Sequence, residues 1–154
     1  MDIIITAATG TGNTELSAFD NALWNAGVAN YNLIKLSSII PPASRIILKK
    51  PEQNPEEYGR RLYVVMSEQR ASKKGQVACA GVGWYILEDG RGVFVEHHGT
   101  SVKKVESEIK KSLQDLADQR GIKGVQFNMK ISSAKCTSKP VCALVCAIYK
   151  SEPW

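Results

Sequence analysis

The sequence predicts an α+β domain made of two similar β-α-β halves, in which each half contributes a sheet covered by one helix. Two observations predict this class. Short apolar runs of strand length recur along the whole chain, whereas only two segments, near residues 14–26 and 101–121, have the three- and four-residue apolar spacing of a helix. Each of these segments follows a strand and precedes further strands. A length of 154 residues fits one domain with a single core.

The first half begins with a buried strand and a capped helix. Ile3–Ala8 is a continuous apolar run that ends in the turn Thr9–Asn13. The glycines of this turn match neither phosphate-loop pattern, so we expect its backbone to approach the active site or a neighbouring subunit. A helix is expected from a Thr14 cap to Ala26, with Gly27 as its left-handed stop. The expected buried stripe of this helix consists of Leu16, Phe19, Leu23 and Ala26.

Strands follow the first helix in close succession. They are expected at about Asn30–Leu36, Ile46–Leu48, Leu62–Glu68 and Gln76–Leu87. The turn Glu88–Arg91 then joins the last of them to a strand at Val93–His97, because Asp-Gly between two extended runs is a strong hairpin signal.

The second helix is the clearest element of the sequence. Ser101 caps its start and Gly121 ends it. Its apolar residues recur at spacings of three and four: Val102, Val105, Ile109, Leu113 and Leu116. Two last strands, Val125–Ser132 and Val141–Tyr149, flank a polar loop and complete the second half.

The charge of the chain indicates a solvated surface. The net charge is +5 and the pI is near 9.0, which makes nucleic acid a partner to consider. The basic residues are scattered, however, and no basic stripe is interleaved with aromatic residues as a single-strand-binding groove requires. We therefore expect no nucleic-acid partner, and keep a basic nucleic-acid-binding module as a rival interpretation.

Hydropathy and cysteine spacing indicate a cytoplasmic protein. No apolar run reaches the roughly 18 to 20 residues of a membrane span, and no basic segment precedes the short apolar start as in a secretory signal. Cys142 and Cys146 are about 13 Å apart on a strand, which is too far for a disulfide. With Cys79 and Cys136 they are expected to be buried free thiols in a reducing compartment.

Three blocks of sequence carry the functional signal. The run Asn32-Leu33-Ile34-Lys35-Leu36-Ser37-Ser38-Ile39-Ile40-Pro41-Pro42 places a serine pair between an apolar strand and two prolines. Upstream stands Leu16-Ser17-Ala18-Phe19-Asp20-Asn21-Ala22-Leu23-Trp24-Asn25-Ala26-Gly27-Val28, and downstream stands Gly92-Val93-Phe94-Val95-Glu96-His97-His98-Gly99. In this order the blocks resemble the pyruvoyl-dependent arginine decarboxylases over nearly the whole chain, although residues 43–74 carry no motif of that family.

The resemblance implies a fold, a reaction and an assembly. The fold is a four-layer αββα sandwich. The resemblance also implies that residues 1–154 form a single decarboxylase domain that would cleave itself between Ser37 and Ser38 into chains 1–37 and 38–154, with Ser38 converted to a covalent pyruvoyl group. The implied reaction converts L-arginine to agmatine and CO2 in the polyamine route. The implied assembly is a homotrimer, or a hexamer, of processed chain pairs with active sites between subunits.

The chemistry requires particular groups around the serine pair. Amino-acid decarboxylation needs an electron sink, which a pyruvoyl carbonyl supplies and ordinary side chains do not. To make that group, the Ser38 hydroxyl attacks the carbonyl carbon of Ser37, which requires a strained or well-oriented peptide and a stabilised oxyanion. By resemblance Asn32 is the oxyanion donor. Glu96 is the acid that returns a proton to the substrate carbon, and apolar neighbours are expected to raise its pKa.

Substrate choice is expected to depend on a carboxylate, because the planar guanidinium group pairs with a carboxylate through two parallel hydrogen bonds. Asp20 occupies the family's position for this role. From spacing alone Asp20 is either a helix-edge residue that reaches water or a carboxylate directed into a pocket. Alternatives left open are a pyruvoyl decarboxylase of another amino acid, such as lysine or histidine, and a homologue that does not process itself and serves as a binding or regulatory subunit.

Two histidines follow Glu96, where the family more often has an acidic or other residue before the glycine. Neighbouring residues of a strand point to opposite faces, so His97 and His98 are not expected to share a metal ion. A third ligand at a suitable spacing is missing. We expect no metal site.

Overall fold

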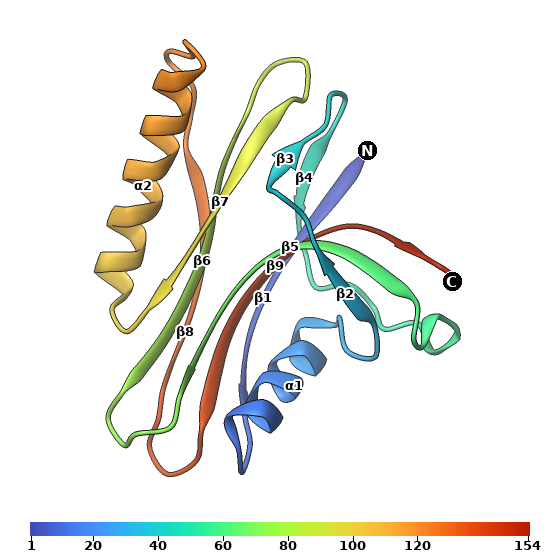
Figure 1. The fold of residues 1–154 in the computed structure, drawn as a ribbon, viewed down its shortest axis with the longest axis vertical. Coiled ribbons are helices and arrows are strands. Elements are labelled where there is room, and N and C mark those ends of the chain that lie inside the picture. Colours follow the sequence, from blue (N-terminus) through green and yellow to red (C-terminus); the bar gives the residue numbers. More distant parts are fainter.

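The fold consists of two helices and nine strands in two sheets (Figure 1). It is described here from a computed structural model that covers residues 1–154. This content confirms the α+β class predicted from the sequence. No helix is long and apolar enough to cross a membrane.

The larger sheet has five strands in the order β2-β5-β9-β1-β4. Their bounds are β1 Asp2–Thr11, β2 Asn32–Lys35, β4 Arg45–Leu48, β5 Arg61–Ala71 and β9 Val141–Glu152. The pairs β1 with β4 and β2 with β5 are parallel, and β9 runs antiparallel to both of its neighbours.

The smaller sheet has four strands in the order β3-β7-β6-β8, and all of its pairs are antiparallel. Their bounds are β3 Ile39–Ile40, β6 Val77–Ile86, β7 Gly92–Gly99 and β8 Asn128–Lys135. The Asp-Gly hairpin between β6 and β7 is confirmed: Gly90 has φ +84°, and the Asp89 carboxylate accepts the Arg91 backbone N–H. The sequence did not predict β3 or the short 3-10 helix η1, Pro55–Glu57.

The expectation that each half of the chain contributes one sheet is corrected by the strand order. The last strand, β9, inserts between β1 and β5 of the first half, and β3 leaves the first half to join β7. The physical reason is that β9 is buried along most of its length, which requires the centre of a sheet.

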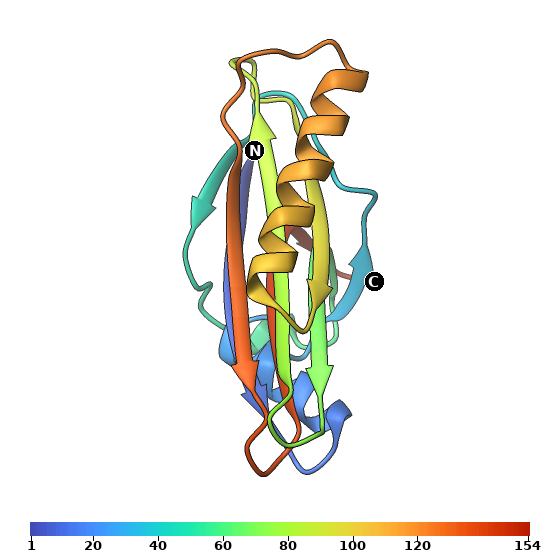
Figure 2. The same cartoon turned by 90° about the vertical axis from the view of Figure 1, so that its left-hand side faces the viewer.

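Each sheet is covered by one helix, and the remaining sheet faces meet in the middle (Figures 1 and 2). Helix α1, Glu15–Ala26, packs on β1, β5 and β9, and helix α2, Val102–Gln119, packs on β6 and β7. Between the sheets, Ile3, Val65 and Val145 of the larger one pack with Val82 and Phe94 of the smaller one. This apolar contact holds the two sheets together.

The buried stripe of α1 differs from the predicted one. Ala26 is buried as predicted, and Phe19 and Leu23 are partly buried against the core, but Ala18 and Ala22 face the sheet and Leu16 is 67% exposed. The cause lies in β1, where a Cβ added to Gly10 would lie 2.2 Å from the backbone nitrogen of Ala22. The helix backbone therefore rests directly on the glycine, which leaves room only for small side chains. The sequence predicted that this turn approaches the active site or a neighbouring subunit, whereas within the chain Gly10 approaches α1.

The predicted helix ends and the stripe of α2 agree closely with the structure. Thr14 caps α1 by accepting the Ser17 N–H, Gly27 follows it with φ +81°, and Ser101 caps α2. The buried residues of α2 are Val105, Ile109, Leu113 and Ala117. They pack over glycines of β6, since a Cβ at Gly83 would lie 2.2 Å from an Ile109 methyl carbon.

Candidate active site

The serine pair lies where the chain crosses from one sheet to the other. Strand β2 of the larger sheet ends at Lys35, and β3 of the smaller sheet begins at Ile39. The crossover is held at both ends: Leu36 donates its N–H to the Val64 carbonyl at 2.9 Å, and the Ser38 carbonyl accepts the Phe94 N–H at 2.8 Å. Ser38 has φ +66°, a left-handed conformation that costs a residue with a side chain about 1–3 kcal/mol. The peptide between the two serines is therefore strained and well oriented.

Glu96 lies directly against Ser38, although the two residues are 58 positions apart. On β7, Val93 and Val95 pack with α2, while Phe94 packs between the sheets. The alternation of the strand turns Glu96 to the same side as Phe94. There the Ser38 hydroxyl donates to Glu96 Oε1 at 2.6 Å, the short distance typical of a hydrogen bond to a carboxylate. Glu96 is thus placed to take a proton from Ser38, a role that the sequence did not indicate.

The carbonyl of Ser37 has no hydrogen-bond partner within the chain. Ser37 is exposed, and no backbone or side-chain donor reaches its carbonyl oxygen. An oxyanion formed on this oxygen would need a donor from water or from another chain.

Tyr149 is a third member of the site, and sequence reasoning did not identify it. Its hydroxyl donates to the Ile39 carbonyl at 2.9 Å, one residue after Ser38, and its ring packs edge-on against Phe94. Burial raises the pKa of Tyr149 to about 12, and the nearby Glu96 carboxylate adds to the shift. The phenol therefore stays protonated and pins the segment that follows the serine pair.

Two cavities meet at Glu96. The first, of about 500 Å³, lies between the Ser37–Ile39 segment, β7 and the outer turns of α2, and includes His97, Ser112 and Asp115. The second, of about 660 Å³, is lined by charged and polar side chains of β5 and β7 and by Glu15 and Lys35. Glu96 therefore has access both to the serine pair and to a second polar space.

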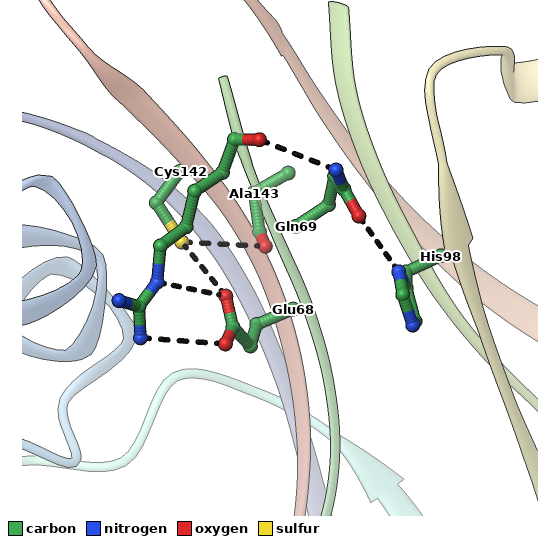
Figure 3. Close-up of polar contacts among 6 residues, drawn as sticks. Glu68, Gln69, His98, Cys142 and Ala143 are labelled. Atoms are coloured by element: carbon green, nitrogen blue, oxygen red, sulfur yellow. Dashed lines mark hydrogen bonds and ion pairs between the residues drawn. The ribbon is translucent and has the colours of Figure 1, made fainter. Parts of the chain in front are cut away.

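The two histidines point to opposite sides of β7, as predicted. His97 Nε2 lies 2.7 Å from the Ser112 hydroxyl on α2. His98 Nδ1 lies 2.7 Å from Gln69 Oε1 on β5 (Figure 3). Each ring therefore contacts a different layer, and one borders each of the two cavities.

A polar network continues from His98 along β5. Arg70 contacts the Glu68 carboxylate through two nitrogens, at 3.2 and 3.4 Å, and lies 4.5 Å from the centre of the Phe19 ring on α1. The Cys142 thiol contacts Glu68 Oε2 at 3.9 Å, as Figure 3 shows, and burial raises the pKa of this thiol to about 12. All four cysteines are free and buried, as expected.

Asn32 lies at the far end of β2 from the serine pair. Its side-chain amide donates to the Gly59 carbonyl at 2.7 Å, and the Trp154 indole donates to the same oxygen at 2.9 Å. Residues 32 to 36 are extended, so about 13 Å of backbone separates Asn32 from Leu36. Within one chain, the structure does not bring Asn32 to the Ser37 carbonyl.

Asp20 is exposed on the outer surface of α1 and makes no hydrogen bond or ion pair within the chain. It lines neither of the cavities that meet at Glu96. The residues predicted for cleavage, catalysis and substrate binding thus form two groups in a single chain: Ser37, Ser38 and Glu96 lie together, and Asn32 and Asp20 lie apart from them.

Comparison with known proteins places this site in a family. The family model for pyruvoyl-dependent arginine decarboxylase matches residues 2–152. The enzyme of that name from Thermococcus kodakarensis is 33% identical over 152 residues, which cover 97% of this chain and 94% of the relative. Those from Pyrococcus furiosus and Thermococcus sibiricus are 33% and 31% identical over 149 and 147 residues, covering 94% of this chain and 92% of each relative. The chain therefore belongs to the pyruvoyl-dependent arginine decarboxylase family.

Proposed function

We propose that this protein is a decarboxylase of L-arginine that makes its own pyruvoyl group by cleaving the Ser37–Ser38 peptide. The observation that carries the proposal is the 2.6 Å contact between the Ser38 hydroxyl and Glu96, at a serine whose backbone has a left-handed conformation. The products of cleavage are chains 1–37 and 38–154, and the products of turnover are agmatine and CO2.

Self-cleavage starts at the Ser38 hydroxyl. Glu96 accepts the hydroxyl proton while Oγ attacks the Ser37 carbonyl carbon, and the proton then passes to the departing Ser38 nitrogen as the amide becomes an ester. Removal of the Ser38 α-proton expels the Ser37 carboxylate and leaves dehydroalanine. Addition of water and loss of ammonia convert this residue to the pyruvoyl group.

The pyruvoyl carbonyl supplies the electron sink for decarboxylation when it condenses with the α-amine of the substrate. Glu96, which takes up a proton from solvent after self-cleavage, then delivers it from Oε1 to the carbon that has lost CO2. The same carboxylate serves both stages because it borders Ser38 and both cavities. Tyr149 holds the Ile39 carbonyl, and therefore the backbone at the new chain end, during both stages.

We infer that Asn32 and Asp20 complete the site of a neighbouring chain in a homotrimer or hexamer. Two features support an assembly. Beyond residue 64, β5 has no strand on its β2 side, and beyond residue 94, β7 has none on its β3 side, so both sheets present open edges next to Ser38. Large apolar side chains are also exposed, among them Leu16 and Ile39, the residue that follows Ser38.

In this arrangement each residue has a defined task. One Asn32 N–H donates to Gly59, which leaves the second N–H for the oxyanion on a neighbour's Ser37. The Asp20 carboxylate has no partner of its own and pairs with the substrate guanidinium. Four buried free thiols fit a reducing compartment, and we place the enzyme in the cytoplasm.

Intact-mass spectrometry tests the proposal before any substrate is added. The wild-type protein should yield chain 1–37 and a chain 38–154 without a free amino terminus, and Ser38→Ala should remain one chain without activity. Agmatine and CO2 should then form from arginine, with lysine and histidine as competing substrates. A wild-type chain that stays intact and still decarboxylates arginine would refute the mechanism. A monomer by light scattering with full activity would refute the shared site.

A further inference from the structure

A separate cavity lies at the carboxyl end of α1. It has a volume of about 210 Å³, and its lining includes Trp24, Tyr31, Tyr58 and Glu57. We refer to these four residues as the aromatic cage. Trp24 and Tyr58 are 53% and 76% exposed, so their rings are open to a ligand from solution.

The cage carries one negative charge. The Tyr31 hydroxyl donates to Glu57 Oε2 at 2.7 Å, and this hydrogen bond lowers the pKa of Glu57. Burial and the same contact raise the pKa of Tyr31 to about 12. The carboxylate is therefore ionised and the phenol neutral at physiological pH. The second carboxylate oxygen forms an ion pair with Arg60 at 3.9 Å, which is beyond hydrogen-bond distance and leaves this oxygen able to accept a hydrogen bond.

No basic side chain of the protein lies over an aromatic ring of this cage, although Arg60 pairs with the cage carboxylate Glu57 from 3.9 Å. The three cation–π contacts of the protein use the rings of Phe19, Tyr63 and Trp154, and none uses a ring of the cage. The last turn of α1 also lacks a basic residue, and only neutral N–H groups of Gly27, Val28 and Gln53 donate to its last carbonyls, so no charge within that turn offsets the negative end of the helix dipole. Aromatic faces, a carboxylate and a helix carboxyl end together favour an organic cation.

We propose that the aromatic cage binds the guanidinium group of arginine or agmatine. A guanidinium is planar, stacks on aromatic rings and forms directed hydrogen bonds to a carboxylate, which matches the groups of the cage. The choice of guanidinium among organic cations rests on the proposed function, in which arginine is the substrate and agmatine the product.

The cage is distinct from the reacting pair of its own chain. Tyr31 precedes Asn32, and about 13 Å of extended backbone follows before Leu36. Trp24 lies one helical turn after Asp20, so both side chains lie on one face of α1. The cage therefore adjoins the carboxylate that we assign to guanidinium recognition.

Calorimetric titration with agmatine tests this site, because agmatine is not turned over. We expect two agmatine sites per wild-type chain. Trp24→Leu, which keeps apolar bulk but removes the aromatic face, should weaken one of them by about 5- to 30-fold. Trp24→Phe is the matched control and should retain most of the affinity. Glu57→Gln should weaken the same site, which guards against a folding defect peculiar to the Trp24 variants.

The same titration of Ser38→Ala with arginine and with agmatine compares the two sources of the guanidinium group. The cage is supported if Ser38→Ala still binds arginine or agmatine and if adding Trp24→Leu to this variant weakens that binding. Equal affinities of Trp24→Leu and Trp24→Phe, or a single agmatine site in the wild type, would overturn it. A failure of the proposed function can be told apart from a failure of the cage. In that case the wild-type chain stays uncleaved, but it still binds guanidinium chloride, and Trp24→Leu weakens this binding.

Discussion

Replacing Glu96 by Gln distinguishes proton transfer from simple hydrogen bonding at the serine pair. Gln keeps the size of the side chain and an oxygen that accepts the Ser38 hydroxyl, but it loses the charge and takes no proton. In the wild type this contact is 2.6 Å long. Loss of a hydrogen bond to a charged group, about 1.5–3 kcal/mol, would slow self-cleavage by roughly 10- to 150-fold. Loss of a general base slows a reaction by about 10²- to 10⁴-fold, and we expect the upper part of that range.

The assay follows intact mass over time, which gives the rate of self-cleavage without substrate. Agmatine release per cleaved chain then gives turnover separately, and we expect it also to fall by about 10²- to 10⁴-fold. Glu68→Gln is the matched control. Glu68 is a half-buried carboxylate of the cavity on the other side of Glu96, and its hydrogen bonds are to Arg70 and Cys142 rather than to Ser38. This variant should cleave at a rate close to that of the wild type.

Near-wild-type cleavage and turnover in Glu96→Gln would refute the assignment. The Ser38 proton would then pass to another group. His97 would be the next residue to replace, because it lines the cavity of about 500 Å³ that also includes Ser38. Normal cleavage with slow turnover would retain the acid role in decarboxylation and remove the role in cleavage.

Three further predictions concern neighbouring contacts. Asp20→Asn should lower kcat/KM for arginine, which corresponds to a loss of about 1.5–3 kcal/mol of transition-state stabilisation, the scale of a charged hydrogen bond, while self-cleavage persists. Unchanged arginine kinetics would favour a helix-edge role for Asp20. Tyr149→Phe loses the 2.9 Å bond to the Ile39 carbonyl and should slow self-cleavage by about 2- to 10-fold, measured by intact mass; an unaltered rate would mean that packing alone holds the segment. The pKa of Glu57 is lowered by Tyr31, so this pair contributes stability above the ordinary pKa of 4.5 that is lost as the pH falls through the folded value. Tyr31→Phe should therefore flatten the acid side of a plot of Tm against pH, and an unchanged slope would show that the hydrogen bond contributes nothing.

Local sequence determined the elements and several of their details. The caps at Thr14 and Ser101, the left-handed Gly27 and the Asp-Gly hairpin were predicted correctly because each depends on residues within about four positions. The opposite directions of His97 and His98 follow in the same way from the two-residue period of a strand. The serine pair and Glu96 were predicted as site residues from two short motifs, residues 32–42 and 92–99, that resemble the family.

Only the tertiary structure decided which of these residues meet. Periodicity does not specify partners far apart in sequence, so it did not predict that β9 lies between β1 and β5 or that β3 joins β7. That crossing brings Ser38 against Glu96 across 58 residues and leaves Asn32 at the other end of β2. The buried face of α1 was predicted only in part, for a related reason: Ala18 and Ala22 were missed and Leu16 is exposed. Large apolar residues usually mark a core, but at Gly10 the close approach of two backbones admits only alanine.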